Sequence, residues 1–595
     1  MAQYFKRRNL DFLLYEVHNA PELTKYPYFE AHDRETFDLV LDSATQIADT
    51  FMHPHFRDLD RHPPELKAGK VTVHPQIKPF LKAVGEGGLI GAGLPFDKGG
   101  QQLPEMLGAC VDFIQMAANN GMMYTGLTAG AANLIATFGS QALVDAYVAK
   151  MLGGEWQGTM ALTEPQAGSS LSDITTSAEP QPDGSHLVRG QKVFISAGDL
   201  DAVDNVVHLM LARIKGAPKG TKGISLFVVP KFRVQQDGTF VDNDVTSTGI
   251  YHKLGQRGTP AMHLTMGDRH DCHGWLLGEA NRGLSYMFQM MNGARIAVGI
   301  TGAAIASAAY CASLEYAKER PQSRRLNEKN QLDSPQTMII NHPDVKRMLL
   351  FQQAIVEGSL SLLLECARLS DLAHVNEGEE KENYTLLLEL LTPVAKTFPT
   401  EMGIRSVSEG LQVLGGYGFT EDFPLEQMYR DIRITTIYEG TTGIQAQDLL
   451  GRKMTIQGGK APRLFFAEMN KTIDEANAHE RLKPYAKMLG DEIQRLQKVT
   501  NTLLPFAQEG NYERFLMDAT LYMELFGLVT VAWQWLKQGI VAQNALLNEN
   551  LGESDADFYE SKIQTMKYFF HYEIPKTLGL AKRLQDTEVL TIVIE

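Results

Sequence analysis

The chain has few cysteines and no excess of basic residues, and both shortages narrow the classes of protein to consider. Its four cysteines, Cys110, Cys272, Cys311 and Cys366, stand apart without a CxxC spacing. Cysteines scattered in this way indicate a reducing compartment, a fold without disulfides and no paired-cysteine site. The formal net charge of −15 argues against non-specific nucleic-acid binding, which needs a basic footprint. A local basic pocket for an anionic ligand is compatible with this charge.

Long apolar runs are also lacking. The N-terminus, MAQYFKRRNLDFLLYEV, has only a brief apolar patch, which Asp11 and Glu16 interrupt. A secretory signal needs a longer apolar run, and a mitochondrial transit peptide is poor in acidic residues. No stretch approaches the ~20 apolar residues of a membrane span. We therefore expect a soluble cytoplasmic protein without a membrane span.

What is present is an ordinary globular composition on a long chain. The 595 residues are 44% apolar and 21% charged, which is typical of a soluble protein with several domains. The residue patterns change from helical to strand-like and back, so we expect a mostly α fold with a central antiparallel β domain. The expected parts are an N-terminal extension at 1–34, an α domain at 35–155, the β domain at 156–281, a second α domain at 282–455 and an extra helical domain at 456–595.

The patterns behind this division are periodicities. Apolar residues recur at helical spacing in 37–51 and again in the long segments 295–320 and 344–369. Between them, HLVRGQKVFIS, NVVHLMLARI and GISLFVVP are short β-branched runs that turns such as QPDG and KGAPKG separate. The segment YMELFGLVTVAWQWL is apolar around most of a helix, which predicts burial on several sides. A membrane-surface helix is the alternative, but such a helix usually has a basic polar face.

Two segments in the β region could contribute to a ligand site. MALTEPQAGSS (160–170) is a tight polar turn after a strand, and such a turn exposes backbone N–H groups that can hold a pyrophosphate or a flavin edge. The alternative is a helix-capping loop. GQKVFISAG (190–198) is expected as an edge strand with Phe194 and Ser196 on one face. This pair could cover a planar ring and bond its rim, or could be a core residue and a turn hydroxyl.

Two further segments lie in the second α region. LQVLGGYGFTEDFPLEQMYRDIR (411–433) carries Gly415, Gly416 and Gly418, which end a helix and let other groups approach the backbone. TTIYEGTTGIQ (435–445) places Glu439 in a loop ahead of another helix. Taken alone, the first is a helix C-cap and the second a solvated charge at a helix N-terminus.

Together, in this order and at these separations, the four segments resemble the acyl-CoA dehydrogenase family over about residues 35–450. The resemblance implies an α–β–α fold, FAD as cofactor and a homodimer or homotetramer with a site shared between subunits. The positions that match flavin-binding positions of the family are Met160, Leu162, Thr163, Gly168, Ser169, Phe194, Ser196, Arg320, Gln412, Gly415, Gly416 and Thr441. Arg320 and 412–416 match the part that reaches the FAD of a neighbouring subunit. The family often has Trp and Thr where Phe194 and Ser196 stand.

The resemblance also implies the chemistry. Glu439 is expected to remove the α-proton of an acyl-CoA thioester, because a carbon acid this weak needs a positioned base and a stabilised enolate oxygen. An acyl chain that expels water should raise the pKa of this carboxyl group. The β-hydrogen then leaves as hydride to the flavin, which gives a trans-2-enoyl-CoA. The positions that match substrate contacts are Ser169, Asn292, Arg295, Tyr438 and Gly440. The family often has Asp where Asn292 stands.

The length and the C-terminal segments resemble a bacterial subgroup that includes 3-methylmercaptopropionyl-CoA dehydrogenases. The expected substrate is then 3-(methylthio)propanoyl-CoA or a fatty acyl-CoA, and electron-transfer flavoprotein is the expected electron acceptor. Two alternatives share the fold: an acyl-CoA oxidase that uses oxygen, and a non-catalytic assembly protein. The second predicts loss of the base, whereas Glu439 is present.

Three other patterns are interpreted as structural. The glycine-rich stretch 86–100 lacks the third glycine of GxGxxG and predicts a loop between helices. RHDCHG (269–274) has no second ligand pair and predicts a surface loop. His53, His55 and His62 stand among prolines and acidic residues and predict a solvated loop. No metal site is expected.

Overall fold

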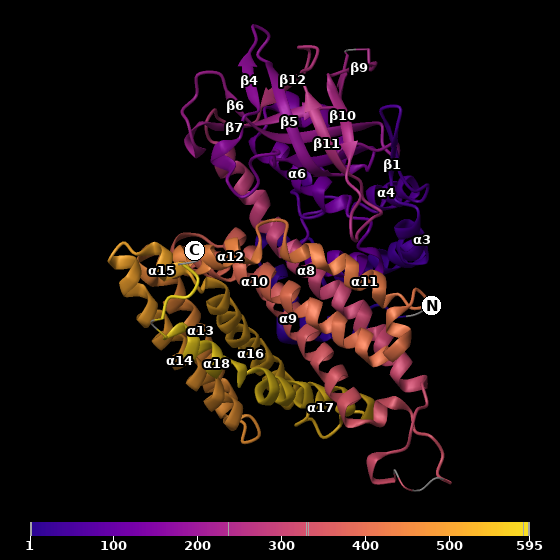
Figure 1. The fold of residues 1–595 in the computed structure, drawn as a ribbon, viewed down its shortest axis with the longest axis vertical. Coiled ribbons are helices and arrows are strands. Elements are labelled where there is room, and N and C mark those ends of the chain that lie inside the picture. Colours follow the sequence, from indigo (N-terminus) through magenta and orange to yellow (C-terminus); the bar gives the residue numbers. More distant parts are fainter. Residues whose placement is uncertain (1–2, 236, 329, 331–332, 587, 593–595) are drawn as a thin grey trace. The chain divides into compact units, whose positions relative to one another are not determined.

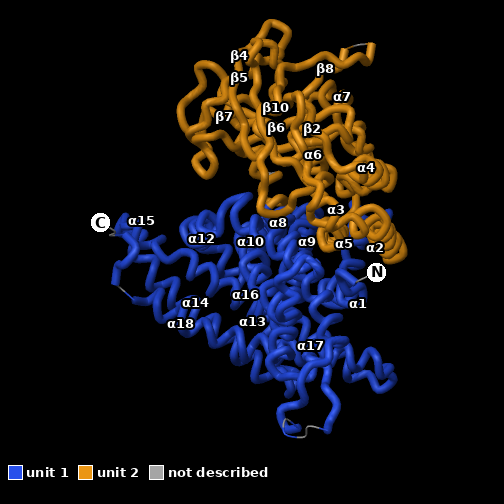
Figure 2. The backbone as a smooth tube through the Cα atoms, turned by 45° about the vertical axis from the view of Figure 1, so that its right-hand side comes forward, with its two compact units in different colours: residues 1–31, 295–595 blue, residues 32–294 orange. Residues whose placement is uncertain are grey.

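The computed structural model describes residues 3–235, 237–328, 330, 333–586 and 588–592. The chain forms two compact units, which Figure 2 shows in orange and blue. The first comprises residues 32–294, and the second combines residues 1–31 with 295–595. The N-terminal extension therefore belongs to the unit formed by the C-terminal half of the chain.

Residues 32–152 are mainly helical. The first helix, α2, begins after Asp33, whose carboxylate accepts the backbone N–H of Thr36 at 2.8 Å and caps the helix. The glycine-rich stretch 86–100 consists of turns and one short 3₁₀ helix, so the prediction of a loop between helices is confirmed. The helices are α2 (Arg34–Ile47), α3 (Phe56–Arg61), α4 (Ile77–Glu86), α5 (Glu105–Asn119), α6 (Thr125–Phe138) and α7 (Gln141–Leu152). The hairpin β1 (Glu65–Lys67) and β2 (Lys70–Thr72) lies between α3 and α4.

An eight-stranded sheet follows, in the order β10-β11-β5-β12-β7-β6-β3, with β4 beside β5 and β6. Most neighbours are antiparallel, but the β3–β6 and β4–β6 pairs are parallel. The strands are β3 (Trp156–Ala161), β4 (Ser177–Pro180), β5 (His186–Ser196), β6 (Asn205–Ile214), β7 (Ile224–Pro230), β10 (Val245–Ile250), β11 (Ala261–Met266) and β12 (His273–Leu276). A separate hairpin pairs β8 (Phe232–Val234) with β9 (Phe240–Asp242). Helix α6 lies close to β3, since the N–H of Gly158 donates to the Thr128 hydroxyl at 3.1 Å.

Strand β5 corrects one prediction. It is not an edge strand, because β4, β11 and β12 all pair with it. The register of the β5–β11 pair shifts between Met262 and Leu264, and Phe194, opposite this shift, has a φ of 59°. This irregularity is a bulge, which re-aims side chains locally. Phe194 is 61% exposed while its neighbours Val193 and Ile195 are buried.

The second unit is built from helices. Figure 1 shows most of them in pink, orange and yellow, whereas α1 lies in the indigo N-terminal part of the chain. The helices are α1 (Arg7–Asp11), α8 (Gly283–Glu319, which starts in the first unit), α9 (Pro343–Val375), α10 (Gly378–Leu414), α11 (Leu425–Ile432), α12 (Thr442–Gly451), α13 (Lys460–Asn477), α14 (Lys483–Gln508), α15 (Tyr512–Leu516), α16 (Ala519–Ala545), α17 (Glu553–Tyr568) and α18 (Lys576–Leu584). Short 3₁₀ and π turns connect several of them.

Glycines let α8 and α10 approach each other closely. A Cβ at Gly299 would lie 2.0 Å from the carbonyl oxygen of Ala395, and one at Gly302 would lie 3.1 Å from that of Pro399. Pro399 stands inside α10 and has no N–H to bond the Ala395 carbonyl four residues earlier. The freed carbonyl therefore faces the glycine side of α8. This backbone contact fixes the part of α10 that follows Ala395 against the part of α8 that follows Arg295.

Helix α16 is buried, as its apolar composition predicts. Trp535 is fully buried, and its indole N–H donates to the carbonyl oxygen of Ala354 on α9 at 3.0 Å. Tyr522 is also fully buried and shares a hydrogen bond of 2.7 Å with Thr500 on α14. These contacts support burial within the helical unit rather than the membrane-surface alternative.

Two of the described helices are long and apolar enough to differ from the expectation that no segment resembles a membrane span. By length and composition alone, α8 and α9 could cross a membrane, with mean hydropathy of 1.6 and 1.3 in their most apolar windows. Inside the protein, 83% and 89% of these windows are buried. Core helices of a globular protein have the same character.

Candidate active site

Glu439 lies in a turn whose backbone is held in an uncommon conformation. The turn links the 3₁₀ segment Arg433–Thr436 to α12. Glu439 has a φ of 53° and Gly440 a φ of 87°, so two consecutive residues occupy the left-handed region. For a non-glycine residue this region costs on the order of 1–3 kcal/mol and is concentrated at functional sites. The Gln445 side chain fixes the turn by donating to the Glu439 carbonyl at 2.9 Å.

Thr441 and Tyr438 flank this turn. The hydroxyl of Thr441 accepts the N–H of Ile444 at 3.3 Å and caps α12. Thr441 therefore has a structural role in addition to the cofactor contact expected from the sequence. The Gly440 position favours glycine because its φ of 87° strains any other residue, and a Cβ there would displace the Gln445 amide that bonds the turn. Tyr438 is half-buried beside the turn.

The Glu439 carboxyl group is partly removed from water. Burial raises its pKa, while the cations of Arg295 and Lys396 act in the opposite direction. Arg295 is buried on α8, and its guanidinium lies 3.2 Å from the Asp448 carboxylate of α12. The structure thus brings Glu439 and Arg295 together, and the interpretation of Glu439 as a fully solvated charge is wrong. Asn292 is half-buried, one helical turn before Arg295 on α8.

The 160–170 segment is anchored by a buried ion pair. Lys192 Nζ lies 2.9 Å from Glu164 Oε1 and also donates to the Leu162 carbonyl at 3.0 Å. The second oxygen of Glu164 accepts the N–H of Thr175 at 2.7 Å and its hydroxyl at 2.9 Å. Burial alone would raise the pKa of Glu164, but the Lys192 cation and the donors of Thr175 and Thr176 outweigh it and lower the pKa to about 2.

This anchor places the expected flavin-binding residues of the β domain together. The N–H of Val193 donates to the Thr163 carbonyl at 2.9 Å, which sets Thr163 beside Phe194. The Phe194 ring stacks on Tyr251 with centroids 4.3 Å apart. Met160, Leu162, Thr163 and Ser196 are half-buried, and Gly168 and Ser169 are exposed. An exposed aromatic face next to a polar turn fits the planar ring and polar rim of a flavin.

A second group of expected cofactor residues gathers at the C-terminal end of α10. The Arg320 guanidinium lies over the Tyr417 ring, 5.7 Å from its centroid. Tyr417 belongs to the turn Gly415–Phe419, and Gln412, Gly415 and Gly416 are exposed. In the described part of the chain no atom lies within 4 Å of a Cβ built at Gly415 or Gly416. The backbone here is therefore open to an approaching group, as an adenine-binding role requires.

Four residues near these sites were not predicted from the sequence as site residues. Glu164 and Lys192 form the buried pair described above, and Lys396 and Glu401 lie on α10 close to Glu439. Glu164 stands inside the quoted TEPQAGS motif, which could have marked it. No local signal marks the other three, because each depends on a partner distant in the sequence.

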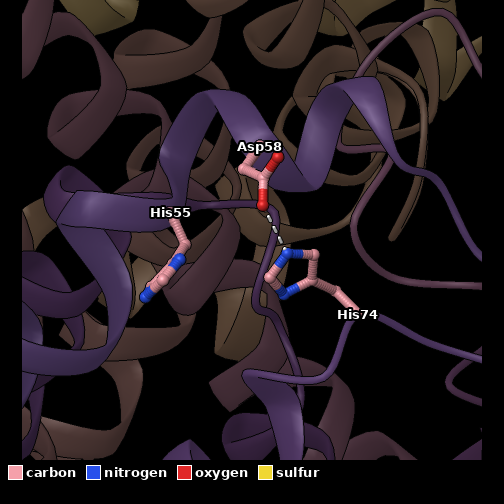
Figure 3. A group of neighbouring side chains, drawn as sticks. All are labelled: His55, Asp58 and His74. Carbon is pink, nitrogen blue, oxygen red and sulfur yellow. Dashed lines mark hydrogen bonds and ion pairs between the residues drawn. The ribbon is translucent and has the colours of Figure 1, made fainter.

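The described residues contain one group of side chains that could hold a metal ion, His55, Asp58 and His74 (Figure 3). His74 Nδ1 accepts the N–H of Gln76 at 3.2 Å, so the ring proton of the neutral imidazole is on Nε2. This Nε2 lies 2.7 Å from Asp58 Oδ2 and donates to it. A metal-bound histidine needs an acceptor for its other ring N–H, whereas Nδ1 faces a donor. The group is therefore arranged as a hydrogen-bonded pair with His55 nearby.

The histidine-rich segment itself corrects a prediction. Residues 53–61 are not a loop: His53–His55 form a 3₁₀ turn that leads into α3. His53 and His55 are half-buried, and His62 lies exposed at the end of α3, 2.9 Å from the Asp58 carboxylate. Proline is tolerated in the first turn of a helix, so Pro54 does not prevent the 3₁₀ turn. In the 269–274 segment, Cys272 is fully buried and burial raises the pKa of its thiol.

Comparisons with known proteins agree with this architecture. The chain matches the N-terminal domain of acyl-CoA dehydrogenase at 34–155, the middle domain at 159–268 and the C-terminal domain at 281–454. Residues 465–593 match an acetyl-CoA dehydrogenase C-terminal-like domain. A crystal structure of an acyl-CoA dehydrogenase of Bacillus anthracis, complexed with FAD, shares the fold with a TM-score of 0.72 and 20% identity, over 94% of this chain and 90% of that one.

Sequence relatives are closer. The 3-methylmercaptopropionyl-CoA dehydrogenase of Ruegeria pomeroyi is 38% identical over 83% of this chain and 82% of its own length. The broad-specificity linear acyl-CoA dehydrogenase of Mycobacterium tuberculosis is 31% identical over 96% of this chain and 95% of its own. The chain therefore belongs to the acyl-CoA dehydrogenase family. This membership confirms the predicted fold, the class of oxidoreductase and FAD as the cofactor.

Proposed function

We propose that this acyl-CoA dehydrogenase oxidises short linear acyl-CoA thioesters, with Glu439 as the base that removes the α-proton. The observation that carries the proposal is the Glu439 turn. It holds a carboxyl group on a strained backbone, fixes that backbone through Gln445, and raises the pKa of the group by burial. A raised pKa brings a carboxylate closer to the strength needed for a weak carbon acid.

The residues around Glu439 support proton removal in complementary ways. Arg295 provides a buried positive charge that opposes protonation of Glu439 and so keeps it ready to accept a proton. The Glu439 N–H would hold the thioester oxygen, where negative charge develops. The binding site for the acyl-CoA would be lined by Asn292, Tyr438, Gly440 and Ser169. When bound, FAD would be the oxidant that accepts the β-hydrogen together with two electrons.

Two groups of residues would hold the cofactor. In the β domain, the Thr163–Phe194 surface would take the flavin ring, and Gly168 and Ser169 would approach the phosphates. These positions are supported by the Glu164–Lys192 anchor behind them. The open Gly415–Gly416 backbone with Arg320 and Gln412 would bind the adenine half of the FAD in a second copy of the chain. This arrangement requires a homodimer or homotetramer.

Short linear acyl groups are the substrate class that the relatives favour. Besides the two relatives above, a butyryl-CoA dehydrogenase of Syntrophomonas wolfei is 34% identical over 79% of this chain. A 3-(methylthio)propanoyl group has the same number of chain atoms as a pentanoyl group, with sulfur in place of one methylene. One narrow linear pocket could therefore accept both. We propose electron-transfer flavoprotein as the electron acceptor and the cytoplasm as the location.

A substrate panel tests this proposal. The FAD-loaded protein is mixed without oxygen with butanoyl-, pentanoyl-, 3-(methylthio)propanoyl- and palmitoyl-CoA, and the loss of flavin absorbance is followed. We expect fast bleaching with the three short thioesters and slow bleaching with palmitoyl-CoA. Fast bleaching with palmitoyl-CoA alone would contradict the substrate class. Subsequent admission of oxygen separates the dehydrogenase, which forms little peroxide, from the oxidase alternative, which forms it stoichiometrically.

A further inference from the structure

Lys396 differs from the other buried lysines of this protein. Four lysines are buried among the described residues: Lys192, Lys396, Lys453 and Lys562. Three of them have a carboxylate oxygen close to Nζ, at 2.9 Å for Lys192, 2.7 Å for Lys453 and 2.8 Å for Lys562. Lys396 is fully buried, yet its Nζ has no hydrogen-bond partner in the described part of the chain. A buried ammonium group without a direct partner is costly and calls for a role.

The fold holds Lys396 next to the Glu439 site. The glycine contact between α8 and α10 joins Gly299 to Ala395, the residue before Lys396. On the next turn of α10, Thr400 donates its hydroxyl to the Lys396 carbonyl at 3.0 Å, a bond that helical threonines can make, in the part of the helix that Pro399 makes irregular. Backbone contacts therefore fix Lys396 on α10, and its side chain is fully buried.

Three charged groups from three parts of the fold act on Lys396. Glu401 lies on α10 itself, Glu439 on the turn before α12, and Arg295 on α8. The hydroxyl of Thr442 donates to Glu401, which ties α10 to the start of α12. Arg295 already has a direct carboxylate partner in Asp448, whereas Lys396 has none. Burial lowers the pKa of Lys396 to about 8, so the group remains charged at pH 7.

We infer that Lys396 is a positioning residue for the proton-abstracting Glu439, a fixed positive charge that keeps this carboxylate ionised while the site is closed to water. The inference rests on the proposed function, since it assigns a partner to the same base. Arg295 acts on Glu439 in the same direction, but the Asp448 carboxylate at 3.2 Å balances part of its charge, whereas Lys396 Nζ is buried without a hydrogen-bond partner among the described residues. Lys396 is fully buried, and a charge in a low-dielectric interior acts more strongly on its neighbours than a charge in water.

A positive charge at Lys396 should affect the pH dependence of kcat/KM in one direction only. Removing a nearby cation makes ionisation of a carboxylate less favourable, so Lys396→Met should raise the pKa of Glu439 and move the acid limb of kcat/KM to higher pH. A nearby opposite charge typically shifts a carboxyl pKa by about one unit or more. The variant should thus lose about tenfold of its activity on the acid limb and recover it at higher pH.

Two further substitutions at this position and one control sharpen the test. Lys396→Gln is a second neutral variant and should shift the limb in the same direction, and Lys396→Arg keeps the charge and should leave the limb in place. Lys562→Met removes an equally buried lysine, on α17, whose partner is Glu357. This control should lower the thermal midpoint without moving the limb. FAD content and the thermal midpoint are recorded for each purified protein.

A stability measurement provides a readout that does not depend on turnover. In urea unfolding, Lys396→Met should cost less in a Glu439→Gln background than in the wild type, because the substitution then removes a charge that has lost its counter-charge. An unshifted acid limb in both neutral variants, or additive stability changes, would overturn the role of Lys396 while leaving Glu439 as the base. Full activity of Glu439→Gln would instead overturn the proposed function itself.

Discussion

At the scale of single residues, the active-site turn combines backbone strain with a desolvated carboxyl group. The left-handed φ of Glu439 is followed by that of Gly440, and the Gln445 amide holds the turn. The identity of Glu439 could be predicted from its sequence motif. Its conformation and its cationic neighbours could not, because α8 and α10 supply them from positions 144 and 43 residues away.

The buried pair in the first unit leads to a prediction at the same scale. Glu164→Gln leaves Lys192 charged and buried without its counter-charge, so the free energy of unfolding should fall by about 3–5 kcal/mol. The turn that carries Thr163 should loosen as well, and FAD should be retained less well. Urea unfolding and the absorbance ratio of flavin to protein measure the two effects.

An exposed pair in the same unit is the matched control. Lys150 and Glu155 lie 2.6 Å apart, but both side chains are about half exposed, so Glu155→Gln should cost less than about 1 kcal/mol. Equal effects of the two substitutions would show that Glu164 does not anchor the turn.

At the scale of helices and strands, periodicity predicted which elements form but not where they deviate from regularity. The alternation of 190–196 predicted an edge strand with Phe194 and Ser196 on one face, and the strand itself exists. Its place inside the sheet and its bulge depend on β11, β12 and β4, which lie elsewhere in the sequence. The close approach of α8 and α10 at Gly299 and Ala395 also joins residues far apart in the sequence.

That helix contact gives a prediction at this scale. Gly299→Ala would place a Cβ 2.0 Å from a backbone carbonyl, so α8 and α10 must separate. We expect a loss of about 1–3 kcal/mol in unfolding free energy. We also expect a fall in kcat, because α8 carries Arg295 and α10 carries Lys396, the two cations near Glu439. Gly579→Ala on α18, exposed and with no atom within 4 Å among the described residues, should be neutral or stabilising. Wild-type behaviour of Gly299→Ala would exclude the contact.

At the scale of the whole chain, the N-terminal extension packs within the unit formed by the C-terminal half. Asn9 accepts a hydrogen bond from Lys562 of α17, whose Nζ also lies 2.8 Å from Glu357 of α9. His18 Nδ1 lies 3.2 Å from Glu365, and its Nε2 lies 3.1 Å from the Ser361 hydroxyl. Hydropathy could not predict where this extension packs, because its contacts are buried polar groups more than 300 residues away.

His18 makes this docking sensitive to acid. Burial, with the nearby cations of Lys537 and Arg368, lowers its pKa to about 4 from an ordinary 6.5. Between about pH 6.5 and pH 4, His18 is protonated in the unfolded chain but neutral in the folded chain. The free energy of unfolding therefore falls as the pH drops through this range. The contribution is up to about 3 kcal/mol. His18→Gln cannot titrate, so the loss of urea stability between pH 7 and pH 5 should be smaller in this variant than in the wild type; an equal loss would refute the assignment.

The central claim is that Glu439 takes the α-proton, and anaerobic reduction of the bound flavin by a short acyl-CoA tests it most directly. Glu439→Gln is nearly isosteric, so it should fold, bind FAD and bind the thioester, but an amide cannot accept the proton. Loss of a general base costs about 10²–10⁴-fold, and we predict that flavin bleaching slows by at least this factor. In the wild type, the bleaching rate should rise with pH along a limb above the ordinary carboxyl range, because burial raises the pKa of Glu439. A Glu439→Gln variant that bleaches its flavin as fast as the wild type would contradict the account.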